Sequence, residues 1–235
     1  MPVSHSFSVI HAGRTAYNDA LALQRAQLEQ VVAQRDNSES ADAGRLILTE
    51  HDPVVTVTRR PDAPGNVLVP EPALAAMGVE LVETDRGGDV TYHGPGQLVC
   101  YPIVDLNRVK LRIHEYIRAL EHAVIGTLDH FGIEGHRDES ATGVWVHRAD
   151  GVQAKVCAVG VRVRRWVAMH GLAINIDPDM DHFGLIVPCG LSGRAVTSLK
   201  EIAGDRCPSL DEVAGVLVGE LESAFNRGVS RGDSR

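Results

Sequence analysis

Residues 86–97 hold four glycines and one proline within twelve positions, and this run limits the possible fold more than any other segment. Glycine and proline cost conformational entropy or a ladder hydrogen bond, so they weaken any strand that they interrupt. Such a run is typical of backbone that must approach something closely, for example a ligand chain or an acyl carbonyl. A plain β-bulge followed by a hairpin turn explains the composition equally well.

The hydrophobic pattern around this run predicts an α/β protein with a mixed sheet. Helices are expected over 15–35 and 113–131, and from Ser209, which forms a capping box with Glu212. The β-prone segments between them lack regular βαβ alternation: 45–49, 54–58, 80–84, 90–92, 97–101, 144–147, 155–163 and 166–176. Arg164 and Arg165 are expected to link the last two as an antiparallel hairpin. A length of 235 residues fits a single domain over 1–227, followed by a disordered tail over 228–235.

Charge and hydropathy exclude several classes of protein. The net charge of -8 argues against a nucleic-acid-binding protein, because such proteins carry a basic excess. The first residues lack a cationic start followed by an apolar run, so no secretory signal is expected. No apolar stretch approaches the ~18 residues of a membrane span. We therefore expect a cytoplasmic protein without a membrane or nucleic-acid partner.

The four cysteines are Cys100, Cys157, Cys189 and Cys207, and their spacing contains no CxxC pair. Neither a zinc site nor thioredoxin-like chemistry is expected, and a disulfide framework is unusual in a reducing cytosol. Cys100 and Cys157 lie in apolar strands, which is typical of inert core thiols. Cys189 lies between Pro188 and Gly190, so it is expected on an exposed turn. If that turn opens a helix, the helix N-terminus favours the thiolate.

Lys155 precedes a nearly apolar segment that includes Cys157, Ala158, Val159 and Gly160. A lysine at the edge of a core can act as a base or as a charge partner. A lysine whose stem is buried while its ammonium reaches water is the alternative, and a lone lysine usually behaves in that way. The thiol, the cation and the glycine-rich run together predict a nucleophile site in a glycine-lined cleft.

Several motifs occur in one order along the chain: the run 86–97, Lys155 before 158–160, 170–175, the turn around Cys189, and 196–199. Over residues 45–200 the chain resembles the octanoyltransferases of lipoate biosynthesis, which carry these motifs in this order. It departs from them in two places. Thr58 stands where relatives often have glycine, and Cys157 stands where they usually have alanine.

The resemblance implies a fold similar to that of biotin and lipoate protein ligases, with a mixed sheet flanked by helices, and it implies no cofactor or metal. It implies that Cys189 carries an octanoyl group as a thioester, and that Lys155 lowers the pKa of that thiol. The donor would be octanoyl-acyl carrier protein. The acceptors would be lysines of lipoyl domains, in E2 subunits of 2-oxoacid dehydrogenases and in the glycine cleavage H protein. The expected substrate-binding residues are Arg86, Gly87, Gly88, Asp89, Val90, Thr91, Tyr92, His93, Ala158, Val159, Gly160, Gly171, Leu172 and Ala173.

Both protein substrates are expected to be acidic, so docking on a chain of net charge -8 would need a local basic patch. The candidates are Arg59, Arg60, Arg162, Arg164 and Arg165. A solvated hairpin face explains the same arginines.

Three other functions fit parts of the sequence. An ATP-dependent lipoate or biotin ligase would share the fold but needs no nucleophilic cysteine, so Cys189 favours transfer. A non-catalytic acyl-binding adaptor would not need Lys155 and Cys189 intact. A thiol hydrolase would pair its cysteine with an orienting histidine, and neither His93 nor His170 is identified as that partner by the sequence.

Overall fold

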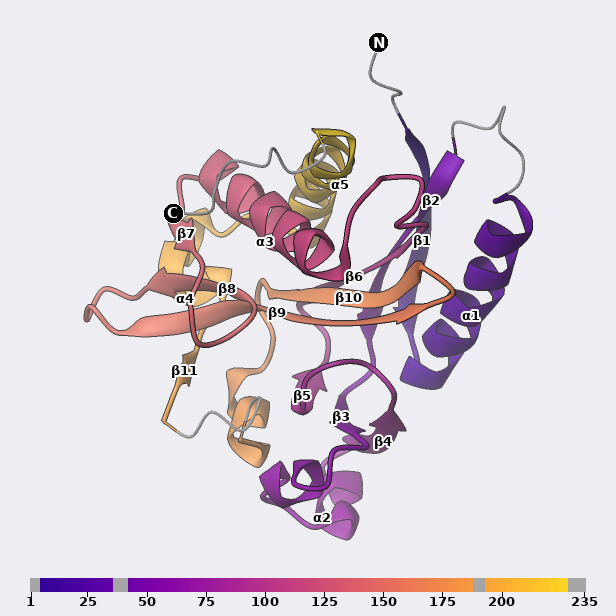
Figure 1. Cartoon of the computed structure of the whole chain (residues 1–235). Helices are drawn as coiled ribbons and strands as arrows, with labels where there is room; N and C mark the ends of the chain where they lie inside the picture. Colours follow the sequence, from indigo (N-terminus) through magenta and orange to yellow (C-terminus); the bar gives the residue numbers. More distant parts are fainter. Residues whose placement is uncertain (1–4, 36–41, 188–192, 228–235) are drawn as a thin grey trace.

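The structure is a computed structural model, and it describes residues 5–35, 42–187 and 193–227 (Figure 1). Its strands form two sheets. The larger sheet has the order β1-β2-β6-β10-β9-β8-β7, and β11 pairs with β9 beside this path. The strands of the larger sheet are β1 (Ser6–Thr15), β2 (Asp42–His51), β6 (Gln97–Val104), β7 (Gly135–His136), β8 (Val144–His147), β9 (Gln153–Arg164), β10 (Val167–Asn175) and β11 (Ala195–Val196).

The larger sheet is mixed, as predicted. Antiparallel pairing runs from β2 through β6, β10, β9 and β8 to β7, whereas β1 pairs with β2 and β11 pairs with β9 in parallel. The sequence analysis did not predict β1. Its side chains are mostly half-exposed or exposed, and its register with β2 shifts near Gly13. A strand with this irregular exposure lacks the period-two pattern by which strands are recognised.

Helices cover both faces of the larger sheet (Figure 1). On one face lie α3 (Ile113–His130) and α5 (Leu210–Arg227), whose apolar sides share a core with β6, β9 and β10. On the other face α1 (Tyr17–Ala33) packs on β2, β6 and β10. The short helix α4 (Leu199–Ala203) follows β11. The mixed sheet flanked by helices is therefore confirmed.

The smaller sheet has the order β4-β3-β5 and its own apolar core. Its strands are β3 (Val54–Thr58), β4 (Glu80–Thr84) and β5 (Val90–His93). The core is closed by α2 (Glu71–Ala76) and by 3₁₀ turns at Ala63–Asn66 and Met180–Leu185. This sheet matters for function because the glycine-rich run begins directly after β4 and contains β5.

Local sequence explains where the long helices begin and end. The Glu115 carboxylate accepts a hydrogen bond from Arg112 N at 2.7 Å, and Gly132 ends α3 with a φ of 71°. Ser209 and Glu212 form the predicted capping box of α5, with Ser209 N 2.8 Å from Glu212 Oε2. No described helix is both long enough and apolar enough to cross a membrane.

The β9–β10 hairpin turns one residue later than predicted, at Arg165 and Trp166, because Arg164 still pairs with Val167. Both turn residues have positive φ, 52° and 62°. Two-residue hairpin turns of this kind usually contain asparagine and glycine, so arginine and tryptophan at these positions do not indicate the turn. Arg35 holds the strained turn by donating from Nη2 to Arg165 O at 2.6 Å.

Candidate functional site

The glycine-rich loop crosses β9 with its backbone almost in contact. Gly87 N donates to Val161 O at 2.8 Å. A Cβ on Gly160 would lie 2.7 Å from Gly87 O, closer than real Cβ atoms approach oxygen. Only glycine fits at this crossing, which explains why the chain keeps glycine here despite its cost in conformational entropy. The loop therefore encloses space on both sides of the crossing.

Arg86 holds the loop in this position. Its Nη2 donates to Thr56 Oγ1 at 3.0 Å and to Asp89 O at 3.2 Å, and its Nη1 donates to Gly87 O at 3.0 Å. A guanidinium fixes several acceptors at once because its donors form a rigid fork. Arg86 thus ties β3 to the loop, and its charge faces the first of two pockets.

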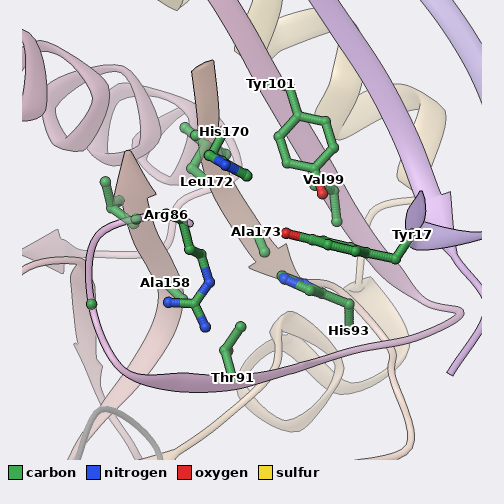
Figure 2. A pocket seen from close by; sticks show the side chains of 14 residues that line it. Tyr17, Arg86, Thr91, His93, Val99, Tyr101, Ala158, His170, Leu172 and Ala173 are labelled. Atoms are coloured by element: carbon green, nitrogen blue, oxygen red, sulfur yellow. The ribbon is translucent and has the colours of Figure 1, made fainter. Parts of the chain in front are cut away.

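We call the cavity on one side of the crossing the inner pocket (Figure 2). Its volume is about 40 Å³. The predicted substrate-binding residues 158–160 of β9 and 171–173 of β10 form one of its walls. The two strands pair there directly, Ala158 with Ala173 and Gly160 with Gly171. The lining residues are Tyr17, Arg86, Gly88, Thr91, His93, Val99, Tyr101, Ala158, Val159, Gly160, His170, Gly171, Leu172 and Ala173.

The ionisable groups of the inner pocket, apart from Arg86, are held neutral. Burial lowers the pKa of His93 to about 3, with a smaller contribution from His51. Burial also lowers the pKa of His170 to about 3, and the Arg86 charge adds to the effect. Burial raises the pKa values of Tyr17 and Tyr101. At neutral pH the pocket therefore suits an uncharged group.

Hydrogen bonds fix the tautomers of both histidines. Gln97 donates from Nε2 to Tyr92 O and Asn175 Oδ1, so its Oε1 faces His93 Nδ1 at 2.9 Å and accepts a hydrogen bond from it. His93 Nε2 is therefore the unprotonated nitrogen. His170 Nε2 lies 2.9 Å from Asp85 Oδ1 and donates to this carboxylate. Asp85 also forms an ion pair with Arg162.

The outer pocket lies on the other side of the crossing, has a volume of about 300 Å³, and contains Lys155. Both pockets are lined by Gly88, Val159 and Gly160, so they meet at the crossing. The remaining lining residues of the outer pocket are Arg60, Gly87, Asp89, Ile117, Ser140, Ala141, Thr142, Lys155 and Val161.

Lys155 is buried, with only 6% of its surface exposed, and its ammonium group has defined partners. Nζ donates to Thr142 O at 3.0 Å and lies 4.9 Å from the centroid of the Trp145 ring. A cation over an indole face is stabilised by the ring quadrupole. The ammonium is therefore held at one place in the wall of the outer pocket.

The predicted substrate-binding residues of the run 86–93 divide between different surroundings. Thr91 and His93 line the inner pocket, and Asp89 lines the outer pocket. Val90 and Tyr92 pack into the core of the smaller sheet. Alternate residues of a strand face opposite sides, so β5 can direct only every second side chain to the pocket.

Cys189 lies outside the described residues, and only the chain on either side of it is described. Before it, Val187 N donates to Asn66 O at 2.8 Å. After it, β11 pairs in parallel with β9, with Val196 opposite Lys155. Thr197 N also donates to Lys155 O at 2.9 Å. The chain that follows the segment 188–192 thus returns directly beside Lys155.

The three described cysteines are not set up as nucleophiles. Cys100 and Cys157 are fully buried, and burial raises the pKa of Cys157 to about 12 and that of Cys100 further. Burial also raises the pKa of the half-buried Cys207 thiol. Thiols with raised pKa values are poor nucleophiles at neutral pH.

Most of the arginines considered for docking are neutralised by ion pairs. Arg59 pairs with Glu83 at 2.6 Å, Arg162 with Asp85, and Arg165 with Glu29. Arg60 and Arg164 are exposed, and their side chains form no ion pair or hydrogen bond with other residues that the structure describes. Only Arg60 of these two lines the outer pocket.

The sequence analysis missed residues that become neighbours only in the fold. Tyr17 of α1 and Tyr101 of β6 close the inner pocket, and Thr142 holds Lys155. Single tyrosines and threonines in ordinary hydrophobic patterns give no indication of such roles. Within the described ranges no group of three or more histidine, cysteine or acidic residues is arranged to hold a metal ion.

The chain matches the lipoyl protein ligase A/B catalytic domain over residues 16–222. An octanoyltransferase from Chloroflexus aurantiacus is 42% identical over 221 residues, covering 94% of each protein. An octanoyltransferase from Caldicellulosiruptor bescii is 44% identical over 199 residues, covering 84% of this chain and 82% of that protein.

Two solved structures show the fold. A bi-partite lipoate protein ligase from Thermoplasma acidophilum superposes with a TM-score of 0.70 at 17% identity, covering 94% of this chain and 84% of that one. A biotin protein ligase from Aquifex aeolicus gives 0.53 at 12% identity, covering 94% and 71%. The expected biotin and lipoate ligase-like fold is therefore confirmed. With this fold, and with relatives more than 40% identical over most of its length, the chain belongs to the octanoyltransferase family.

Proposed function

We propose that the protein transfers an octanoyl group from octanoyl-acyl carrier protein to a lysine of a lipoyl domain, through a thioester on Cys189. The observation that carries the proposal is the position of Lys155. Its ammonium lies in the wall of the outer pocket, and the outer pocket meets a neutral inner pocket at Gly88, Val159 and Gly160. A fixed cation beside a slot for an uncharged chain is what cysteine-dependent acyl transfer requires.

The first step forms the acyl-enzyme. An unperturbed cysteine thiol has a pKa of about 8.5, and a nearby ammonium stabilises its thiolate. The Cys189 thiolate attacks the thioester carbonyl, a bond from the acyl carbon to Sγ forms, and the bond to the carrier sulfur breaks. Lys155 gives a proton to the departing sulfur. One thioester replaces another, so this step is nearly isoenergetic and needs no ATP.

The second step forms the amide. The neutral amine of the acceptor lysine attacks the acyl-enzyme, its surplus proton passes to the neutral Lys155, and Cys189 leaves as a thiolate. Both groups then return to their starting charges. The amide is more stable than the thioester, so the second step drives the overall transfer.

The inner pocket is proposed to take the far end of the acyl chain. It meets the outer pocket at Gly88, Val159 and Gly160, and Tyr17 and Tyr101 also line it. A volume of about 40 Å³ holds only a few water-sized groups. The rest of the chain therefore extends past Gly160 into the outer pocket, or the lining opens as the chain enters.

The proposed acceptors are lipoyl domains of E2 subunits and the glycine cleavage H protein. Membership of the octanoyltransferase family supports this choice of substrate, and the lipoate protein ligase from Thermoplasma acidophilum is described together with its E2 lipoyl domain. Arg60 is the cation that we propose to meet an acidic carrier protein at the outer pocket.

The proposal is tested by intact mass spectrometry after mixing the protein with octanoyl-acyl carrier protein. We expect one octanoyl adduct that hydroxylamine removes, no adduct on Cys189→Ala, and a normal adduct on the matched control Cys207→Ala. An adduct on Cys189→Ala would exclude Cys189 as the carrier. A second arm supplies free octanoate, ATP and a lipoyl domain, and octanoylation of the domain in that arm would favour an ATP-dependent ligase.

A further inference from the structure

Residues 141–143 form a turn whose Thr142 carbonyl binds the Lys155 ammonium, and the buried carboxylate of Glu121 holds this turn in place. Glu121 lies on α3, and its side chain is only 1% exposed. Its Oε1 accepts a hydrogen bond from Gly143 N at 3.0 Å. A buried carboxylate is costly unless it is paired and hydrogen-bonded, so its place in the core calls for an explanation.

Gly143 lies against the stem of Lys155. A Cβ on Gly143 would lie 3.4 Å from Lys155 Cε and 2.5 Å from Cys157 O, so the backbone of the turn approaches both residues closely. The preceding carbonyl, Thr142 O, accepts the hydrogen bond from Lys155 Nζ at 3.0 Å. The stem of Lys155 therefore lies where a side chain of residue 143 would project, while the neighbouring carbonyl binds the ammonium.

The other end of the same turn is held by Trp145. Its Nε1 donates to Ala141 O at 3.2 Å, and its ring is the one that faces Lys155 Nζ. The pairing of β8 with β9 shifts register between Val144 and Trp145, so one residue of β9 next to Lys155 bulges out of the ladder. Bulges of this kind redirect neighbouring side chains and are frequent beside active sites.

The charge of Glu121 is balanced away from the turn. Oε2 accepts from Arg118 Nη1 at 2.7 Å and lies 3.4 Å from Arg137 Nε. Both arginines are partly exposed, with 49% and 36% of their side chains accessible. One carboxylate oxygen thus meets surface cations, and the other is left for the Gly143 amide.

We propose that Glu121 is a positioning residue for Lys155. It acts through the Gly143 amide and the Thr142 carbonyl, and it fixes where the ammonium lies in the outer pocket. The inference rests on the proposed role of Lys155 in acyl transfer. A buried helix residue thereby determines the geometry of a reaction that it never touches, because small displacements of a reacting group are expensive in rate.

The test uses the fact that the chain contains only three lysines, Lys110, Lys155 and Lys200. Protein labelled with ¹³C at lysine Cε gives three resonances, which Lys→Arg variants assign. The Trp145 ring current should shift the Lys155 resonance away from the other two. In Glu121→Met, which keeps the volume but removes the acceptor, we expect the Lys155 resonance to move towards the others while those of Lys110 and Lys200 stay in place.

Glu121→Gln is the matched control, because an amide oxygen still accepts from Gly143 N. We expect it to keep the Lys155 resonance and most of the acylation rate, whereas Glu121→Met loses about 10-fold or more in the rate with little change in KM. Should Glu121→Met fail to fold, Glu121→Asp, which withdraws the acceptor, is expected to shift the Lys155 resonance in the same direction.

The outcomes separate this inference from the proposed function. An unmoved Lys155 resonance in folded Glu121→Met or Glu121→Asp overturns the positioning role, whatever the activity. Equal shifts in the Gln and Met variants overturn the route through the Gly143 amide. A moved resonance with an unchanged acylation rate supports the positioning role and instead removes Lys155 from the proposed chemistry.

Discussion

The two pockets differ in what their walls are made of. The inner pocket is lined by neutral groups, including two histidines whose pKa values are lowered to about 3, with Arg86 as its one cation. The outer pocket contains Lys155 and Arg60 beside polar residues of the turn 140–142. The difference is consistent with the proposed function, in which one pocket receives an uncharged chain and the other handles charge and proton transfer.

The strongest test of this division removes the charge from the outer pocket. Lys155→Met should keep the fold, because the long apolar side chain replaces a buried stem. We expect the rate of acyl-enzyme formation to fall about 100-fold or more, the usual size of a general acid-base contribution. Single-turnover acylation measured by quenched flow gives this rate. Wild-type rates in Lys155→Met would mean that the outer pocket does no chemistry.

The next test alters the backbone crossing between the pockets. In Gly160→Ala the new methyl group meets Gly87 O, so we expect the free energy of unfolding to fall by about 1–3 kcal/mol. Urea denaturation measures it. Gly215→Ala is the control, because Gly215 lies within α5 and a Cβ there meets nothing within 4 Å. That variant should gain about 0.5–1 kcal/mol. Equal stability of both variants would argue against a tight crossing.

The neutrality of the inner pocket predicts sensitivity to acid. The folded pKa of His93 is lowered to about 3, so between pH 6.5 and 3 the unfolded chain binds a proton that the folded chain does not. Stability is therefore lost as the pH falls through this window. Lowering the pH from 7 to 5 should therefore reduce the free energy of unfolding by about 2 kcal/mol less in His93→Gln than in wild type. Urea denaturation at the two pH values measures this difference.

Exposed His122 on α3 provides the control for that measurement. His122→Gln should leave the difference in stability between pH 7 and pH 5 unchanged. If His93→Gln shows the same difference in stability between pH 7 and pH 5 as wild type, the inner pocket does not hold His93 neutral. The two pockets would then not differ in the charge of their walls in the way described above.

The smallest expected effect concerns the approach of the carrier protein. Arg60→Ala should raise the KM for octanoyl-acyl carrier protein about 3- to 10-fold at low salt, and less at high salt because exposed charges are screened. Arg59→Ala is the matched control, since Arg59 is already paired with Glu83. Steady-state kinetics at two salt concentrations distinguishes them. Equal effects would indicate a diffuse charge contribution rather than contact at the outer pocket.

Local patterns predicted the elements with strong periodicity and clear ends. The helix over 113–131 is observed as Ile113–His130, and the capping box at Ser209 is confirmed. The strand Ser6–Thr15 was missed because its exposure follows no regular alternation. The hairpin turn was misplaced by one residue because arginine and tryptophan occupy positions where positive φ is unusual.

The candidate site could be predicted only where the structure requires an unusual residue, such as glycine at a close backbone contact. The glycines near Arg86 and at 160 mark the crossing, and Lys155 was chosen for its place beside an apolar strand. Glu121 gives no such indication, since it looks like one more acidic residue on a helix that contacts solvent. Its role depends on Gly143, which lies 22 positions away along the chain. The role of Cys189 stays a prediction.

The partition between the pockets is built largely from main-chain atoms of Gly87 and Gly160. A substitution changes a side chain but leaves the peptide group in place, so neither natural selection nor engineering can readily alter this partition. Altered chain-length preference would have to come from the distal surface, where Tyr17, Val99 and Tyr101 offer replaceable bulk. A library aimed at those three positions would vary selectivity while leaving the partition intact.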